Sequence, residues 1–467
     1  MKKLILTALL AGIASTVTGL SQAADNAALI QQGKYLATAG DCQACHRTRE
    51  DATKLPLSGG YVIQSPMGAI ISSNITPSKS HGIGNYTEAQ FTRAVRDGIR
   101  ADGANLYPAM PYTSYRGLSD ADMHALYTYF MQGVEPVDEG VPATQLSFPF
   151  NQRWLMKGWN LLFLKAEPAA QAPQAPEVQA RGRYLVDTLG HCGSCHTPRN
   201  VLMAESSQYL AGGSVGGWYA PNITSDKVSG IGAWSEDELV QYLSSGHVQG
   251  KGQAGGGMAE AVEHSLRHLS DADLHTMAAY LKNVPPISEP GQSLPRSGIT
   301  ARGGADNLEP LIPRSASDMT NSTSVDGEQL YMGACASCHQ PDGKGTGDQF
   351  YPALDHNSAT GDVRADNLIM AIVQGVDRNT NGYKVSMPAF ADQLNDEQIV
   401  AVSNYVLQHF GNAKVKVDAQ TVAQVRQGGP VPLLIKVTPY LLWLGGLLGV
   451  VVIVLLVRWW VRRRQVR

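Results

Sequence analysis

Three stretches of the chain share one pattern of apolar and polar positions, and each predicts an amphipathic helix. Apolar residues recur at helical spacing in all three stretches: Met123, Leu126, Tyr127 and Phe130; Leu274, Met277, Ala278 and Leu281; Ile399, Val402 and Val406. A helix-capping residue precedes each stretch (Ser119, Ser270 and Asn395), with an acidic or amide side chain three positions later. The chain therefore contains three copies of one capped helix.

Other features recur in step with these helices. A short helical pattern begins each copy at Gly33, Gly182 and Gly327. The first two copies also share Asn-Ile-Thr, at 74–76 and 222–224, and Gly-Ile-Gly, at 82–84 and 230–232; the third copy lacks both and is shorter. We predict a mainly α fold of three tandem domains at 25–150, 179–290 and 323–415. Proline-rich composition indicates a connecting segment at 151–178 and a linker at 291–322.

The two ends predict export and anchoring. Lys2 and Lys3 precede a short apolar run, and small residues follow it, so 1–23 has the order of a signal peptide. An uncleaved anchor is the alternative. Residues 437–457 contain no charged side chain. The length of this stretch is close to the ~20 residues that a helix needs to span a bilayer. The arginine-rich tail 458–467 predicts a cytoplasmic end and places the rest in the periplasm.

Charge is distributed unevenly. The chain has 37 basic and 40 acidic side chains, and the two ends hold seven of the basic residues and none of the acidic ones. The exported part therefore carries a net charge of −10. This net charge argues against nucleic acid as a partner. It has two interpretations: the acidic surface attracts a basic partner protein, or it is only solvated by water.

All six cysteines lie in three Cys-x-x-Cys-His motifs. The motif residues are Cys42, Cys45 and His46; Cys192, Cys195 and His196; Cys335, Cys338 and His339. Two thioether bonds would fix one haem, and the histidine would bind its iron. A thioredoxin-like pair needs no histidine, zinc would need a second ligand pair, and a structural disulfide would close a very short loop. We therefore predict three covalently bound haem c groups.

Methionines are the candidate sixth iron ligands. Met110, Met258 and Met387 each precede the capped helix of their copy, in sequences rich in proline or glycine that predict loops. Met110 and Met387 are each followed by proline. For the second copy, His247, His264 and His268 are alternatives to Met258.

These residues resemble the triheme cytochrome c subunit of membrane-bound alcohol, gluconate and sorbitol dehydrogenases. The resemblance rests on the three haem motifs, the Asn-Ile-Thr and Gly-Ile-Gly elements, and three further segments: Tyr107 to Tyr112, Cys195 to Arg199, and Phe148 to Leu164. It implies an electron-transfer subunit that accepts electrons from a flavin- or quinoprotein-dependent catalytic subunit and passes them to ubiquinone. It leans toward the flavin-dependent members.

The residues support electron transfer independently of this resemblance. Three haems on one exported, tethered chain would form a relay between a periplasmic donor and an inner-membrane acceptor. The sequence has no dinucleotide-binding or nucleophile motif, so we assign no catalytic residue and expect no oxidation of the organic substrate by this chain alone. The alternatives are the cytochrome subunit of an oxidase, or a multihaem enzyme of the peroxidase or thiosulfate-oxidising type, whose open iron position would best suit the second copy.

Overall fold

The computed structural model describes residues 24–48, 55–164, 177–301, 324–348, 350–380 and 383–465. The predicted signal peptide, residues 165–176 of the connecting segment and most of the predicted linker, 302–322, lie outside this part. With 46% helix and 8% strand, the fold is mainly α, as predicted. We call the three predicted domains, each taken together with the helices that directly adjoin it, repeats 1, 2 and 3.

Repeat 1 begins with a helix over 24–39 and carries one small antiparallel sheet in the order β1-β2-β3, in which Val62 pairs with Ile71 and Ala69 with Gln145. Its further elements are α2 (Cys42–Cys45), β1 (Val62–Ser65), β2 (Gly68–Ile71), α3 (Glu88–Asp97), α4 (Tyr112–Tyr115), α5 (Asp120–Thr128), a π-helical turn (Tyr129–Gly133), β3 (Gln145–Leu146) and α6 (Leu155–Phe163).

Repeats 2 and 3 share with repeat 1 the first helix, the helical turn at the motif and the capped helix, while their strands form two-stranded hairpins at differing places along the chain. Repeat 2 contains α7 (Glu177–Arg183), a π-helical turn (Tyr184–Leu189), α8 (Gly193–His196), β4 (Gly213–Val215), β5 (Trp218–Ala220), α9 (Glu236–Ser245), β6 (His247–Val248), β7 (Gly252–Gln253), α10 (Gly256–His264), a 3-10 turn (Leu266–His268) and α11 (Asp271–Leu281). Repeat 3 contains α13 (Gly327–Ala334), α14 (Ala336–His339), α15 (Asp366–Gln374), β8 (Val376–Thr380), β9 (Tyr383–Met387), α16 (Asp396–His409) and α17 (Ala419–Arg426).

The three predicted helices are confirmed as α5, α11 and α16, and each begins directly after its predicted cap. Each crosses the first helix of its repeat at a glycine. A Cβ added at Gly33, Gly182 or Gly327 would lie 2.0–2.4 Å from a backbone oxygen of the crossing helix. Any side chain at these positions would push the helices apart, which explains the recurring glycine.

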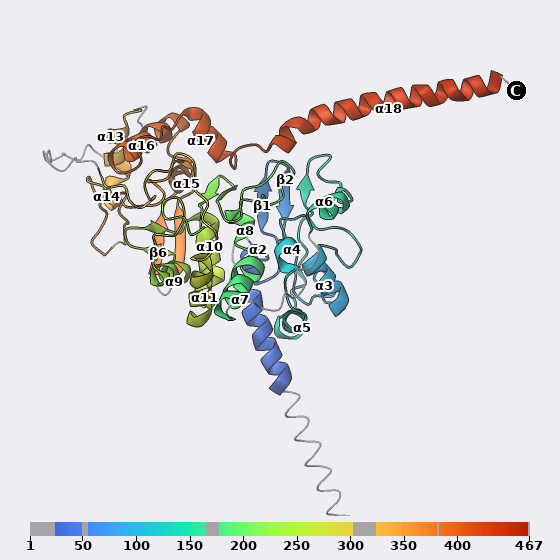
Figure 1. Ribbon diagram of the computed structural model, residues 1–467, viewed down its shortest axis with the longest axis horizontal. Helices are drawn as coiled ribbons and strands as arrows, with labels where there is room; N and C mark the ends of the chain where they lie inside the picture. Colours follow the sequence, from blue (N-terminus) through green and yellow to red (C-terminus); the bar gives the residue numbers. More distant parts are fainter. Residues whose placement is uncertain are drawn as a thin grey trace, which may run out of the picture.

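The interior is divided between two cores. Repeats 1 and 2 share one cluster of buried apolar side chains, while repeat 3, including α17, forms a second cluster. Repeat 2 lies between repeats 1 and 3 (Figure 1). Repeat 1 and repeat 2 therefore fold as a pair to which repeat 3 is attached.

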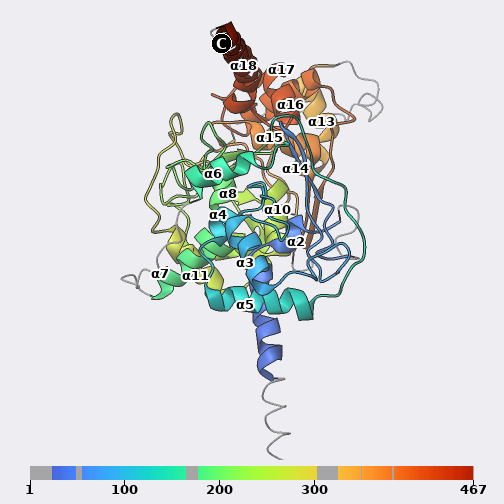
Figure 2. The same ribbon diagram turned by 90° about the vertical axis from the view of Figure 1, so that its right-hand side faces the viewer.

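The C-terminal helix α18 (Leu433–Gln465) projects away from the repeats (Figures 1 and 2). It is the single helix in the described residues that is long and apolar enough to cross a membrane, with a mean hydropathy of 2.7 over its most apolar window. That window is not buried against the rest of the protein. The predicted span 437–457 lies within α18.

Candidate functional site

The three Cys-x-x-Cys-His motifs form the same helical turn. In each, the histidine amide donates to the carbonyl of the first cysteine at 2.9 Å, which closes the turn at His46, His196 and His339. A second backbone hydrogen bond is also common to the three motifs. The carbonyl of each histidine accepts from a glycine amide further along the chain, at Gly59, Gly212 and Gly345. Equivalent backbone bonds therefore give all three motifs the same local geometry.

Each motif histidine is oriented by a backbone carbonyl. His46 Nδ1 lies 2.7 Å from Ser73 O, His196 Nδ1 lies 2.7 Å from Pro221 O, and His339 Nδ1 lies 2.9 Å from Pro352 O. An Nδ1–H that donates to a carbonyl fixes the tautomer and leaves Nε2 with its lone pair available for a metal. Burial also lowers the pKa of all three imidazoles, that of His196 to about 4, which keeps them neutral.

The Asn-Ile-Thr elements hold the carbonyls of Ser73 and Pro221 in place. In repeat 1, Asn74 directly follows Ser73, and its Oδ1 accepts from both the amide and the hydroxyl of Thr76, at 2.9 and 2.7 Å. Asn222 makes the same pair of bonds to Thr224 after Pro221, at the same distances. Each element therefore forms a rigid loop whose preceding carbonyl faces the motif histidine.

The cysteine thiols are consistent with haem attachment. All six are free, and burial raises the pKa of Cys42, Cys192 and Cys335 to about 12. A thioredoxin-like pair needs a lowered thiol pKa, so this environment argues against it. Within the described residues, no group of three or more His, Cys, Asp or Glu side chains is placed to hold a metal ion. Two thiols beside one oriented imidazole fit haem c, whose iron exchanges single electrons.

The three candidate methionines occupy different local structures. Met110 lies in a loop before α4, as predicted. Met258 lies in the first turn of α10 and Met387 ends strand β9, so the prediction of a loop was wrong for both. Glycines at the start of a helix and proline directly after a strand produce the same sequence signals as a loop.

Each methionine nevertheless packs against the core that its own motif contacts. Met110 and Met258 are half-buried on the core of repeats 1 and 2, and Met387 on that of repeat 3. Two of the alternative ligands of the second repeat make other contacts: His247 Nδ1 bonds to Gln253 at 2.5 Å, and His268 Nε2 lies 3.1 Å from Glu263 O. Each of these rings keeps its other nitrogen, so Met258 stays the predicted sixth ligand of repeat 2, with His247, His264 and His268 as the alternatives.

Comparison with known proteins identifies the family. Residues 324–410 match the cytochrome c domain family. The chain is 47% identical over 449 residues to the fructose dehydrogenase cytochrome subunit of Gluconobacter japonicus, which covers 94% of this chain and 92% of the relative. It is 38% identical over 441 residues to the gluconate 2-dehydrogenase cytochrome c subunit of Pantoea cypripedii, covering 91% and 96%. The chain belongs to the dehydrogenase cytochrome c subunits. A third relative is the cytochrome c subunit of the quinone alcohol dehydrogenase of Gluconobacter oxydans, 38% identical over 435 residues and covering 90% and 87%.

Membership confirms the resemblance predicted from the motifs. It implies covalently bound haem c, electron transfer and a dehydrogenase catalytic partner for this cytochrome subunit. The number of haems, their sixth ligands and the electron acceptor stay predictions.

Repeats 1 and 2 of the cytochrome subunit exchange one tyrosine each. The Tyr35 hydroxyl donates to Asp273 at 2.6 Å and accepts from the Ser270 amide at 3.1 Å. The Tyr184 hydroxyl donates to Asp122 at 2.5 Å and accepts from the Ser119 amide at 3.3 Å. The sequence predicted these aspartates as capping-box partners. They bind the neighbouring repeat instead, so repeats 1 and 2 meet through equivalent surfaces.

This pairing brings two of the motifs together. The ring of His191, directly before Cys192, packs edge-on against Tyr115 of repeat 1, with centroids 5.5 Å apart. An ion pair of 3.0 Å between Arg47 and Glu260 crosses the same junction. The motifs of repeats 1 and 2 therefore both lie beside the junction of the two repeats.

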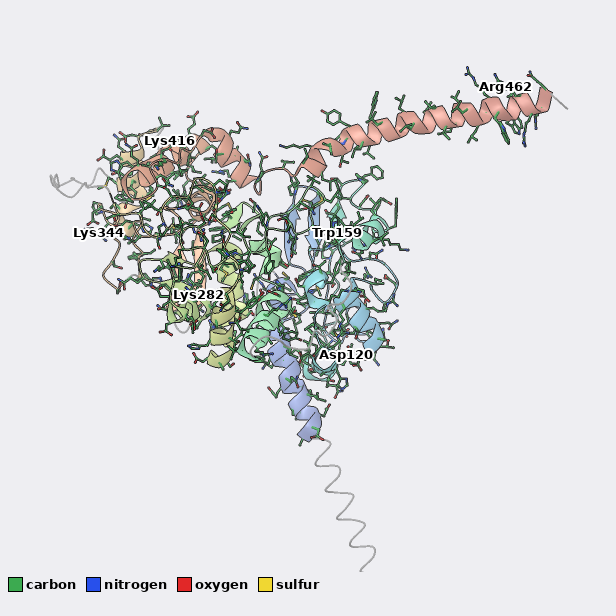
Figure 3. The ribbon with its side chains drawn as sticks, in the orientation of Figure 1. Asp120, Trp159, Lys282, Lys344, Lys416 and Arg462 are labelled. Carbon is green, nitrogen blue, oxygen red and sulfur yellow. The ribbon has the colours of Figure 1, made fainter. Side chains whose placement is uncertain are left out.

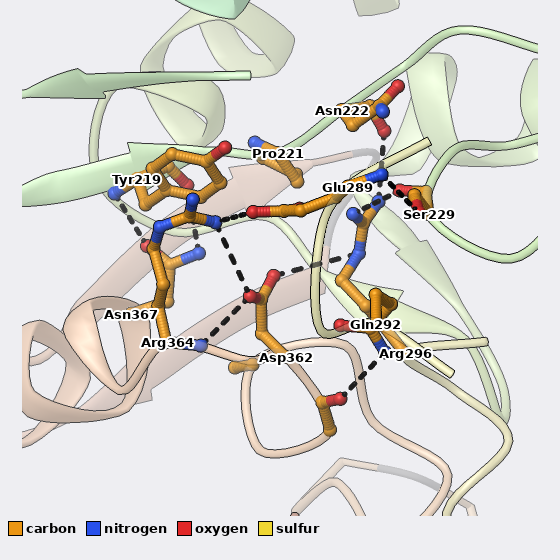
Figure 4. A network of polar contacts seen from close by, with 12 residues as sticks. Tyr219, Pro221, Asn222, Ser229, Glu289, Gln292, Arg296, Asp362, Arg364 and Asn367 are labelled. Atoms are coloured by element: carbon orange, nitrogen blue, oxygen red, sulfur yellow. Dashed lines mark hydrogen bonds and ion pairs between the residues drawn. The ribbon is translucent and has the colours of Figure 1, made fainter. Parts of the chain in front are cut away.

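Repeats 2 and 3 meet through a buried ionic network (Figure 4). Arg296 donates to Asn222 O at 2.9 Å and to Ser229 O at 2.5 Å, and its Nε lies 3.8 Å from Asp362 Oδ2 of repeat 3. Arg364 pairs with Glu289. Arg296 lies in the predicted linker 291–322, so the first part of that segment is packed rather than free. Arg296 thereby connects repeat 3 to the loop that orients His196.

Sequence reasoning missed the orienting carbonyls of Ser73, Pro221 and Pro352. Backbone acceptors carry no residue identity, so no motif marks them directly. For Ser73 and Pro221 the available signal was the Asn-Ile-Thr element that directly follows each of them, which the sequence showed as a repeat without a role; Pro352 has no such element.

Proposed function

We propose that this subunit carries electrons through three c-type haems from a periplasmic dehydrogenase subunit, flavin- or quinoprotein-dependent, to ubiquinone in the inner membrane. The observation that carries the proposal is the threefold recurrence of one geometry: a closed Cys-x-x-Cys-His turn with its histidine fixed by a backbone carbonyl. A relay needs several similar sites on one chain, and a catalytic haem needs a site unlike the others.

The residues have separate roles in this proposal. The cysteine pairs of the three motifs hold the haems, and His46, His196 and His339 supply the proximal nitrogen. Met110, Met258 and Met387 supply the sixth ligand, a soft thioether that stabilises the reduced iron. The reciprocal tyrosine contacts and the Arg296 network keep the three cytochrome c domains at fixed separations.

The proposed location follows from α18. A helix of this length and hydropathy would span the bilayer once, and Arg458 to Arg464 would stay on the cytoplasmic side. The repeats would then lie in the periplasm, after removal of residues 1–23 by signal peptidase. Quinone is confined to the bilayer, so an anchored relay brings the electrons of a water-soluble catalytic subunit to it.

The test compares membranes with and without this subunit, with the same amount of catalytic subunit in both. Without the subunit, substrate-dependent ubiquinone reduction should vanish, while reduction of an artificial dye by the catalytic subunit should persist. Undiminished quinone reduction would refute the proposal, and oxygen consumption that depends on added quinol would favour the oxidase-subunit alternative.

A further inference from the structure

Helix α6 has apolar side chains on both of its faces. Its inner face is held by the protein: Asn160 Oδ1 accepts from the Tyr112 hydroxyl at 2.7 Å, and the Trp159 indole N–H donates to Leu202 O at 2.9 Å. The Trp159 ring also packs on Phe163, with centroids 5.2 Å apart. These contacts fix the helix on repeat 1 through Tyr112 and on repeat 2 through Leu202, and they determine which residues point outward.

The outer face carries large exposed apolar side chains. Trp154, Leu161 and Leu162 are 65%, 86% and 68% exposed, and their spacing places them on one side of the helix. Phe148 in the turn before it is also exposed. A helix that is apolar on both faces is typical of a buried or membrane-contacting position. Leaving these side chains in water forgoes about 1.5–3 kcal/mol for each.

The sequence around α6 is basic, whereas the exported part as a whole is acidic. Residues 140–166 contain three basic side chains, Arg153, Lys157 and Lys165, and no acidic one, although the exported part as a whole is strongly acidic. Lys157 is exposed beside the apolar side chains. Basic residues next to an apolar helical face favour the surface of an anionic bilayer.

The position of α6 agrees with this. In Figure 1, α6 lies at the edge of repeat 1 on the side toward which α18 projects, and in Figure 2, viewed from that side, it lies at the front. Figure 3 shows Trp159 on this side and Lys344 on the opposite side of the molecule. Helix α6 therefore lies on the side of the repeats toward which α18 projects.

We propose that α6 is an interfacial helix that lies in the headgroup region of the bilayer and forms a second membrane contact beside α18. This inference rests on the proposed anchoring by α18. It also gives repeat 1 a defined orientation, because α6 packs on Tyr112, whose amide donates to Met110 O at 2.8 Å. Repeat 1 would then be the repeat held closest to the membrane.

The experiment uses the full-length haem-loaded subunit in nanodiscs of phosphatidylethanolamine and phosphatidylglycerol with a photoactivatable group on the acyl chain. Peptides labelled after illumination are identified by mass spectrometry. Label is expected on the peptides of α18 and of 154–164. Replacing both Leu161 and Leu162 by Gln should reduce label on 154–164 at least about tenfold and leave α18 unchanged. The control is Val325→Gln, an exposed apolar residue of repeat 3, which should change neither.

The outcomes separate this inference from the anchoring proposal. If α18 is unlabelled, the proposed anchor fails. If α18 is labelled but 154–164 is labelled no more than the peptide containing Val325, the interfacial helix is refuted. A third sample contains the catalytic subunit: loss of the 154–164 label on its addition would mean that α6 binds that subunit, and would also overturn the inference.

Discussion

Replacing Arg296 by methionine tests whether the buried network holds repeat 3 to repeat 2. The Arg296 side chain is 7% exposed and that of Asp362 is 3% exposed. Methionine keeps much of the length and apolar bulk of arginine while removing its charge and its donors. Asp362 would lose its most buried partner, and the carbonyls of Asn222 and Ser229 would each lose a donor.

The size of the effect can be estimated from the geometry. Two unit charges 3.8 Å apart attract by about 4 kcal/mol at an effective dielectric constant near 20. Each carbonyl that loses its donor adds about 1–3 kcal/mol. Part of this loss, several kcal/mol, is offset because the variant no longer buries the Arg296 cation away from water. Arg364, 3.9 Å from Asp362, also keeps part of the attraction to that carboxylate. The net loss should be about 3 kcal/mol, in the range known for removing one partner of a buried pair.

The loss should depend on pH. Burial raises the pKa of Asp362, and Arg296 opposes that rise, so the variant should raise the pKa further. When the pKa of a carboxyl is raised in the folded state, the free energy of unfolding is unaffected at a pH below the unfolded-state pKa. It then decreases as the pH increases toward the folded-state pKa. Arg296→Met should therefore destabilise the junction more at neutral pH than in mild acid.

Hydrogen exchange is the suitable assay, because a chain of several repeats does not unfold in one step. Peptides spanning 287–301 and 355–365 should exchange faster in Arg296→Met, and peptides of α5 should not. The control is Arg296→Met combined with Asp362→Leu, which removes the unpaired charge and should restore part of the protection. Equal protection in the wild type and the single variant, or a double variant no more protected than the single one, would refute the reasoning.

Four further predictions follow from the sites and the helix crossings. The mass of the mature protein should exceed its polypeptide by three haems, and a smaller excess from cells with intact haem maturation would exclude three. Met110→Ala should abolish the near-infrared iron–sulfur band of one haem, and an unchanged spectrum would make Met110 a packing residue. Gly182→Ala should destabilise repeat 2 by about 1–3 kcal/mol, because its Cβ would lie 2.1 Å from Thr276 O; Gly158→Ala in α6, with nothing within 4 Å, is the control that should not. Truncation after Lys436 should weaken membrane attachment, and equal attachment at high salt would place the main anchor elsewhere.

The sequence predicted the elements whose patterns depend on local physics. Helical spacing of apolar residues, together with a capping side chain, identified α5, α11 and α16 and the residues that begin them. The recurring glycine before each motif was noticed, but its cause was not evident, since the close approach of Ala125, Thr276 and Ala401 occurs only in the folded chain. The packing of Arg296 was missed for the same reason. Proline and glycine around it predict a linker, and its partner Asp362 lies far along the sequence.

The third repeat shows why a site can persist when its motif is lost. It has no Asn-Ile-Thr element, yet His339 finds the same kind of acceptor in Pro352 O. The loop before Pro352 is closed by a bond of 2.9 Å from the Thr346 amide to Tyr351 O, and a Cβ at Gly345 would lie 2.1 Å from that same oxygen. The histidine requires a fixed carbonyl, and two unrelated loops provide it. Residue identity in these loops is therefore a poor guide to the site, whereas the distance from Nδ1 to a backbone oxygen is a direct one.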